Sequence, residues 1–379
     1  MARRLEKAKK AAPKATATEA PLTAPGVRAI FSPTLDFLCV GGIGICALAA
    51  LALSPRDFAS YAYWPATILG LQILFNFPHF IASYRLLYQS KEIVYRYKWA
   101  SIYLPIGLGS YLLFSLIHPV VFREPVNAKY SELADLISGM YLAAHYAGQT
   151  WGMVASFSYL GGVQIQKIER QMLRTVLLVF VAWHVAIANH LVPKYTLFVP
   201  ELKPVLETLF EVITPFAHVA MVVTIAVFVR MGYRTKRVPP LSALVPIPLL
   251  YFGYLVFTRG YAGLLLLQVC HALQYLIFPL RVEINRCNIE ESHAERNHIV
   301  LYVLALIAAG AFVFLGPDAL PGKTLPFGAM ILLALINIHH YFIDGCVWKI
   351  STPEVKKDLF RHLSRSPLSS SFAKSSAQV

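Results

Sequence analysis

The sequence predicts an all-α protein, a polytopic helical membrane bundle of about ten transmembrane spans with both termini in the cytoplasm. Hydrophobic residues make up 57% of the chain and charged residues only 14%, whereas a soluble domain is about 25% charged. Apolar stretches of roughly 17–25 residues alternate with polar connections, and a helix of that length crosses a hydrocarbon core of about 30 Å. Lys and Arg gather in every second connection, the pattern that the positive-inside rule describes for helical membrane proteins.

The apolar stretches define the expected spans in chain order. None of them contains Lys or Arg, and a helix satisfies its own backbone hydrogen bonds where lipid offers no partner. We expect spans at residues 34–53, 63–84, 100–117, 135–160, 175–191, 211–229, 241–257, 261–280, 299–316 and 325–348.

The distribution of basic residues sets the expected orientation. Of the 34 Lys and Arg residues, 27 lie in residues 1–33, 85–99, 161–174, 230–240, 281–298 and 349–379, and the alternate connections hold the other seven. The first set therefore faces the cytoplasm, and its charge meets anionic membrane lipids. This accounts for the net charge of +14 without a nucleic-acid partner. We expect an integral protein of a bacterial-type inner (plasma) membrane.

The expected domain organisation has three parts. Residues 1–33 form a basic N-terminal tail, residues 34–348 the ten-span bundle, and residues 349–379 a basic, Ser-rich cytoplasmic tail. Residues 1–26 have too little apolar content to fold. The chain has no P-loop, no dinucleotide-binding glycine motif and no C-x-x-C pair among its five cysteines, so nucleotide-driven work and a thiolate zinc site are not indicated.

Histidines inside the spans are the candidate functional residues. Ionisable side chains are costly in hydrocarbon, and they usually face the bundle interior or an aqueous cavity. Eight of the 12 histidines fall in expected spans. Four of them share a helical face with other polar side chains: His79, His145, His271 and His340.

Each of these histidines has polar neighbours at helical spacing. In the second span, Gln72, Asn76 and Ser83 share the face of His79, and Pro78 comes directly before it. In the fourth span Gln149 follows His145 by four residues, and in the eighth span Gln274 follows His271 by three. In the tenth span Asn337 and Asp344 flank His340. Asp344 is the one acid placed well inside a span.

The topology predicts that the four histidines converge. All four spans run in the same direction, and Arg85, Arg281 and Lys349 follow their histidines by six to ten residues. We therefore expect His79, His271 and His340 at similar depth in the cytoplasmic half of the membrane, with His145 nearer the midplane. One shared metal site follows, because imidazole suits iron, copper and zinc. His339, the other member of the His339-His340 doublet, is a further candidate ligand. Asp344, Gln149 and Gln274 would orient the imidazoles or carry protons.

Arg85, Arg281 and Lys349 have two readings. They are either topology anchors, or they bind an anionic headgroup or substrate carboxylate at the mouth of the pocket.

The histidine pattern resembles two groups of membrane oxygenases. One is the bacterial carotene dioxygenase family of the Brp/Blh type, in which a Pro-His pair is similar to Pro78-His79 of this chain. The other, more distant, is the membrane-bound desaturases and hydroxylases, whose H-x-x-H-H clusters are absent from this chain. The resemblance covers four short segments. It implies an iron-dependent oxygenase whose metal is held by histidines from several spans.

Two main functions remain open on the sequence. The first is a membrane metal-dependent oxidoreductase with non-haem iron, or copper or zinc, acting on a hydrophobic, lipid-soluble small molecule. The second is a proton-coupled transporter that uses the intramembrane His and Asp residues. Haem held by paired histidines and a membrane scaffold with structural histidines are further alternatives. The sequence identifies neither the substrate nor an electron donor.

Overall fold

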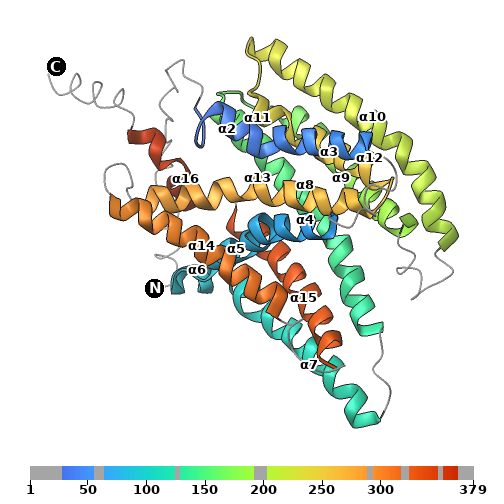
Figure 1. Cartoon of the computed structure of the whole chain (residues 1–379). Helices are drawn as coiled ribbons and strands as arrows, with labels where there is room; N and C mark the ends of the chain where they lie inside the picture. Colours follow the sequence, from blue (N-terminus) through green and yellow to red (C-terminus); the bar gives the residue numbers. More distant parts are fainter. Residues whose placement is uncertain are drawn as a thin grey trace, which may run out of the picture.

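A computed structural model describes residues 28–54, 64–123, 129–191, 203–287, 293–316, 324–348 and 353–365. Every regular element in these ranges is helical, as the sequence predicts (Figure 1). Eight helices are long and apolar enough to cross a membrane: Pro33–Leu53, Trp64–Leu87, Trp99–Phe122, Lys167–Leu191, Lys203–Thr235, Tyr261–Cys287, Asn297–Leu315 and Gly328–Val347. The protein is thus a helical bundle with the composition of a membrane protein.

Two of the ten expected spans differ from this set. The stretch 135–160 lies in α8 (Lys129–Leu160), which is 32 residues long and contains the whole expected span. Polar side chains lower its hydropathy, and it is not among these eight helices. The stretch 241–257 is divided into α11 (Leu241–Leu244) and α12 (Pro246–Phe257). Twelve residues of helix span only about 18 Å, so ten crossings remain a prediction.

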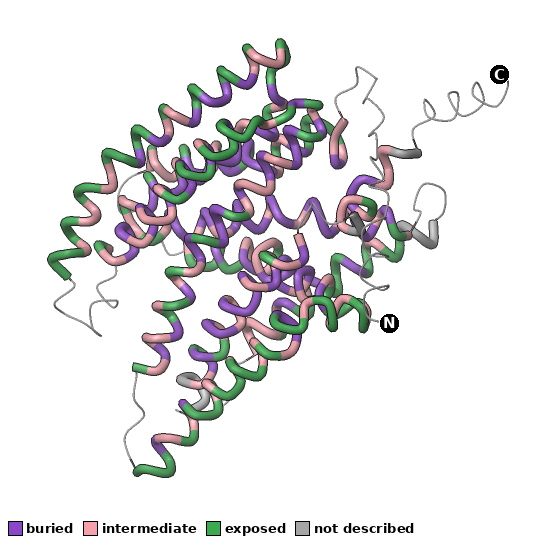
Figure 2. The backbone as a smooth tube through the Cα atoms, turned by 180° about the vertical axis from the view of Figure 1, so that it is seen from behind, coloured by how far each residue is buried: buried purple, intermediate pink, exposed green. Residues whose placement is uncertain are grey.

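Helix α13 (Tyr261–Cys287) is the central element of the bundle. In its most apolar segment 72% of the residues are buried, against 17% for the span Trp99–Phe122, which contains α7 (Leu104–Phe122). Figure 1 shows α13 crossing the middle of the molecule, with α10 (Lys203–Thr235) and α7 at its edges. In Figure 2 the outer helices are exposed along much of their length. Residues on α13 are therefore enclosed by other helices.

Helices far apart in the sequence pack together around this centre. Helix α15 (Thr324–Val347) packs along α8, and α14 (His293–Leu315) packs along α5 (Phe77–Leu87). Helix α5 also contacts α13 and α15. These contacts place α5, α8, α13 and α15 side by side, and each of them carries one of the four candidate histidines.

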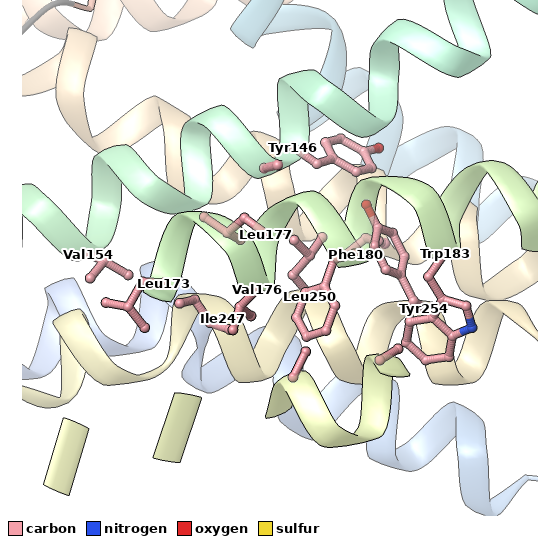
Figure 3. Close-up of a cluster of buried hydrophobic side chains, with 14 of the residues drawn as sticks. Tyr146, Val154, Leu173, Val176, Leu177, Phe180, Trp183, Ile247, Leu250 and Tyr254 are labelled. Carbon is pink, nitrogen blue, oxygen red and sulfur yellow. The ribbon is translucent and has the colours of Figure 1, made fainter. Parts of the chain in front are cut away.

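The largest apolar core joins α8, α9 (Lys167–Leu191), α10 and α12. Trp183, Phe180 and Tyr254 are among its largest fully buried side chains. Figure 3 shows Tyr146 reaching toward this cluster from α8, while Leu250 and Tyr254 come from α12. The core holds α8 and α9 against each other on the side of α8 that carries Tyr146.

The first helical segment follows a capped turn. The carboxylate of Asp36 accepts the backbone N–H groups of Ile30 (2.7 Å) and Phe31 (3.0 Å), and the Ser32 hydroxyl accepts that of Leu35. This is a side-chain cap for groups that have no partner within the helix. The cap precedes α2 (Pro33–Phe37), which continues through the π-helical turn Leu38–Gly42 into α3 (Ile43–Leu53).

The described ends of the chain meet on one side of the bundle. A ring nitrogen of His362 lies 2.9 Å from the Ala29 carbonyl oxygen. The Asn285 amide donates to the carbonyls of Asp358 and Leu359, so α16 (Pro353–Phe360) and the following 3-10 turn (Arg361–Arg365) dock on α13. The remainder of both expected tails lies outside the described residues.

Candidate metal centre

Four histidines from four helices meet in the interior. His79 of α5, His145 of α8, His271 of α13 and His340 of α15 are 2%, 7%, 5% and 0% exposed. Their ring centroids lie 4.5 Å apart for His79 and His340, 4.7 Å for His145 and His271, and 5.0 Å for His145 and His340. The side chains singled out in the sequence are therefore brought into one cluster.

The local helix geometry presents one nitrogen of His79 to the cluster. A π-helical turn, Gln72–Asn76, connects α4 (Trp64–Leu71) to α5, and Pro78 occupies the first turn of α5. The Nδ1 atom of His79 lies 2.5 Å from the Asn76 carbonyl oxygen. Because a carbonyl only accepts, Nδ1 carries the proton and Nε2 keeps its lone pair. That Nε2 atom is buried without a partner among the described residues.

His145 and His271 bring their ring nitrogens within hydrogen-bonding distance of each other. Their Nε2 atoms are 2.8 Å apart. This separation suits one N–H···N hydrogen bond. It also suits two ligands of a single ion, because bonds of about 2.1 Å at a right angle place the two nitrogens about 3.0 Å apart.

His340 and Asp344 supply further donor atoms one helical turn apart. Asp344 Oδ2 lies 3.4 Å from His340 Nε2 and 3.8 Å from His145 Nε2. Neither ring nitrogen of His340 nor Asp344 Oδ2 has a hydrogen-bond partner among the described residues. Buried polar atoms are rarely left this way, so this group of atoms is suited to a bound cation.

The other oxygen of Asp344 is held by a hydrogen-bond chain. The Ser83 hydroxyl donates to Asp344 Oδ1 at 2.8 Å, and the Tyr275 hydroxyl lies 3.1 Å from the same oxygen and 2.5 Å from Ser83 Oγ. The Trp348 indole N–H donates to Tyr275 at 2.8 Å. The sequence places Ser83 on the polar face of the second span; the structure makes Ser83 and Tyr275 the residues that orient Asp344.

Gln149 and Gln274 serve the helix interface rather than an imidazole nitrogen. The Gln149 amide donates to the His271 backbone carbonyl at 2.9 Å and to the Gln274 side-chain oxygen at 3.3 Å. Gln274 in turn donates to the Val40 carbonyl. They position α8 against α13 beside the cluster.

His339 lies outside the cluster. Its Nδ1 atom is 2.9 Å from the Tyr84 hydroxyl, and its Nε2 atom is 2.7 Å from the Ala100 carbonyl oxygen. Consecutive residues of a helix point about 100° apart, so His339 and His340 face different neighbours. The doublet in the sequence therefore contributes one histidine to the cluster.

Two of the three cationic residues considered as a pocket mouth have partners within the protein. Arg85 donates to Glu283 at 2.6 Å, and the Arg281 guanidinium lies over the Phe31 ring. Lys349 lies outside the described residues. Glu283 also meets His298 at 2.8 Å. Glu283, His298 and Cys287 form a second group of possible metal ligands. The carboxylate charge of Glu283 is, however, balanced by the ion pair with Arg85.

A cavity of about 560 Å³ borders the cluster at His145, Tyr275 and Asp344. Its other walls come from α8, α9, α13 and α15, and aromatic side chains supply much of their surface. A volume of this size is typical of small-molecule sites. The cluster therefore has an adjoining space large enough for a small molecule.

The donor atoms fit a metal ion. One nitrogen from each of His79, His145 and His340 lies within 4.8 Å of the other two, and ligands on opposite sides of one ion are about 4.2 Å apart. His271 adjoins this group through its contact with His145, and Asp344 adjoins it through its contact with His340. Neutral imidazoles with a carboxylate suit iron, zinc and copper. Comparisons with protein-family models, curated proteins and solved structures gave no match to this chain.

Proposed function

We propose that this chain is an integral-membrane, metal-dependent oxidoreductase of the oxygenase type that acts on a lipid-soluble substrate. The observation that carries the proposal is the cluster of His79, His145, His271 and His340 with Asp344, which borders a cavity. Within it, donor atoms of His79, His340 and Asp344 are buried without a hydrogen-bond partner among the described residues. The apolar surroundings and walls of this site favour a hydrophobic substrate over a water-soluble one.

Non-haem iron is the proposed metal, with copper or zinc as alternatives that the same ligands accept. His79, His145, His271 and His340 would hold it. When bound, iron or copper would supply Lewis acidity and a site for dioxygen chemistry, whereas zinc would supply Lewis acidity alone. A haem does not suit the cluster, because Nε2 atoms 2.8 Å apart are too close to lie on opposite faces of a macrocycle.

The protein's own residues contribute orientation and proton control. The Asn76 carbonyl fixes the tautomer of His79, and the Ser83–Tyr275 pair holds Asp344 so that Oδ2 faces His340 and His145. Partners of this kind raise the basicity of metal ligands and fix their direction. Burial by four helices excludes bulk water, which suits chemistry on a lipid-soluble molecule.

The proposed orientation has both termini in the cytoplasm of a bacterial-type inner membrane. It is supported by the segregation of Lys and Arg and by the contact between His362 and Ala29, which puts both described ends on one side.

Elemental analysis of the full-length protein, purified in an uncharged detergent, tests the proposal, with a visible spectrum of the same sample. We expect about one or two iron, copper or zinc atoms per chain, and metal loss in a His79→Ala/His145→Ala double variant that still inserts into membranes. A wild-type protein that stays metal-free after reconstitution would overturn the proposal and turn attention to proton-coupled transport.

A further inference from the structure

The cavity beside the metal centre is elongated along one face of α8. Cavity-lining residues of α8 recur at helical spacing from His145 through Gly148 and Gly152 to Ser156. Eleven residues of helix correspond to roughly 16 Å. The histidine cluster is thus at one end of a space that is long enough for an extended molecule.

Two glycines keep this space open. A Cβ atom built at Gly148 or Gly152 would meet no atom within 4 Å. By contrast, a Cβ at Gly263, where α13 meets α12, would come within 2.6 Å of backbone. Gly148 and Gly152 are therefore not needed for close helix packing, and their effect is to leave room along α8.

The charges on the cavity wall are unevenly placed. Of the residues lining it, only Asp344, which belongs to the metal centre, and two arginines are formally charged at neutral pH. The arginines are Arg170 and Arg174, four residues apart on α9 and hence on one face of that helix. The Arg174 guanidinium lies 5.0 Å from the centre of the Trp151 ring, and Trp151 also lines the cavity.

These two arginines lack carboxylate partners within the part of the chain that the structure describes. Glu169, directly before Arg170, does not pair with either of them. Its carboxylate forms ion pairs with Arg234 at 2.9 Å and with Arg230 at 3.7 Å. Arg170 and Arg174 are solvent-exposed on their outer sides. Guanidinium groups bind carboxylates and phosphates in a bidentate manner, so the pair offers an anion site at the cavity wall.

We infer that the cavity binds a single amphiphile with an anionic headgroup, a carboxylate or a phosphate, at Arg170 and Arg174. Its apolar chain lies over Gly148 and Gly152 and reaches the histidine cluster. The chemistry at the far end rests on the proposed function, whereas the binding itself does not. The two guanidinium groups favour an acid over the corresponding neutral lipid, because no carboxylate among the described residues pairs with either of them and the neighbouring Glu169 is bound by Arg234 and Arg230.

Ligand binding to the full-length protein in an uncharged detergent tests this inference. A fluorescent polyene fatty acid is displaced by oleic acid, by oleoyl lysophosphatidic acid and by oleyl alcohol. The variants are Arg170→Gln/Arg174→Gln and, as a matched control for loss of charge on the same helix, Lys167→Gln, which does not line the cavity. Gly152→Leu fills the open face of α8, and Gly109→Leu is its control on α7, where a Cβ also meets nothing.

We expect the double arginine variant to bind oleic acid at least tenfold more weakly than the wild type and oleyl alcohol less than twofold more weakly. Lys167→Gln should bind both ligands as the wild type does. The preference of the wild type between oleic and lysophosphatidic acid assigns the headgroup. Gly152→Leu should abolish binding of acid and alcohol alike, while Gly109→Leu binds both. Equal weakening of acid and alcohol, or the same loss in Lys167→Gln, would overturn the inference and leave the arginines as general membrane anchors.

The two proposals fail separately. His340→Ala should lose metal and keep arginine-dependent binding of oleic acid. Metal-free wild-type protein that still binds oleic acid through Arg170 and Arg174 contradicts the proposed function alone. A metal-loaded protein that does not distinguish acid from alcohol contradicts the inference alone.

Discussion

The Nε2 atoms of His145 and His271 lie 2.8 Å apart, although 126 residues separate these histidines along the chain. Both side chains are buried, and the carbonyl of His271 accepts a hydrogen bond from Gln149 on the helix that carries His145. The two helices are therefore aligned by a side-chain-to-backbone hydrogen bond near the point where their imidazoles meet. Such alignment fixes the distance between two candidate ligands before any ion binds.

The His339-His340 doublet provides a direct comparison of two adjacent histidines. Replacing His340 with Ala should remove most of the bound metal, because neither of its ring nitrogens has a hydrogen-bond partner among the described residues and Nε2 lies 3.4 Å from Asp344 Oδ2. His339→Ala should retain it, because that ring is bonded to Tyr84 and Ala100. Elemental analysis of both purified variants measures the difference. Equal metal content in the two proteins would mean that His340 is not a ligand.

Asp344 should act through its carboxylate charge. Asp344→Asn keeps an oxygen for Ser83 and Tyr275 and removes the negative charge facing His340, so we expect metal affinity to fall ten- to hundredfold. Tyr275→Phe removes only one of the two hydroxyl groups near Oδ1 and should cause a smaller loss, because the Ser83 bond remains. Competition with a chelator of known affinity measures the metal affinity of both variants. A larger loss in Tyr275→Phe than in Asp344→Asn would contradict the role assigned to the carboxylate charge.

Acidification should release the metal. An imidazole binds a metal only when its ligating nitrogen is unprotonated, and the ordinary histidine pKa is about 6.5. Metal binding is therefore favoured at high pH and is lost as pH falls, over a range steeper than a single proton would give because several imidazoles compete. Metal retained after dialysis between pH 8 and pH 5 measures this. A flat profile would exclude a histidine-dominated site.

Close contact between α14 and α5 should support the position of His79. A Cβ atom at Gly310 would lie 2.8 Å from the backbone carbon of Phe77, two residues before His79. Gly310→Ala should therefore cost about 1–3 kcal/mol through overpacking and lower both the thermal midpoint and metal retention. Gly109→Ala, where a Cβ meets nothing, is the control. An unchanged midpoint in Gly310→Ala would show that α14 moves freely away from α5.

Much of the architecture follows from the sequence because membrane helices are recognisable from length and composition. The division of 241–257 at Val245-Pro246 departed from the expected span. It arises where tertiary packing tolerates what lipid would not: α12 is largely buried by other helices, so it need not be long enough to cross a membrane.

The sequence by itself determined the helical class and the histidines to consider, since a polar face at helical spacing can be read from residue order. Only the tertiary structure decided that His340 and not His339 faces the cluster, that Ser83 and Tyr275 orient Asp344, and that Arg170 and Arg174 line the adjoining cavity. The reason is physical: the contacts between α5, α8, α13 and α15 depend on the rotation of each helix about its axis. Packing against distant neighbours fixes that rotation, and periodicity alone does not.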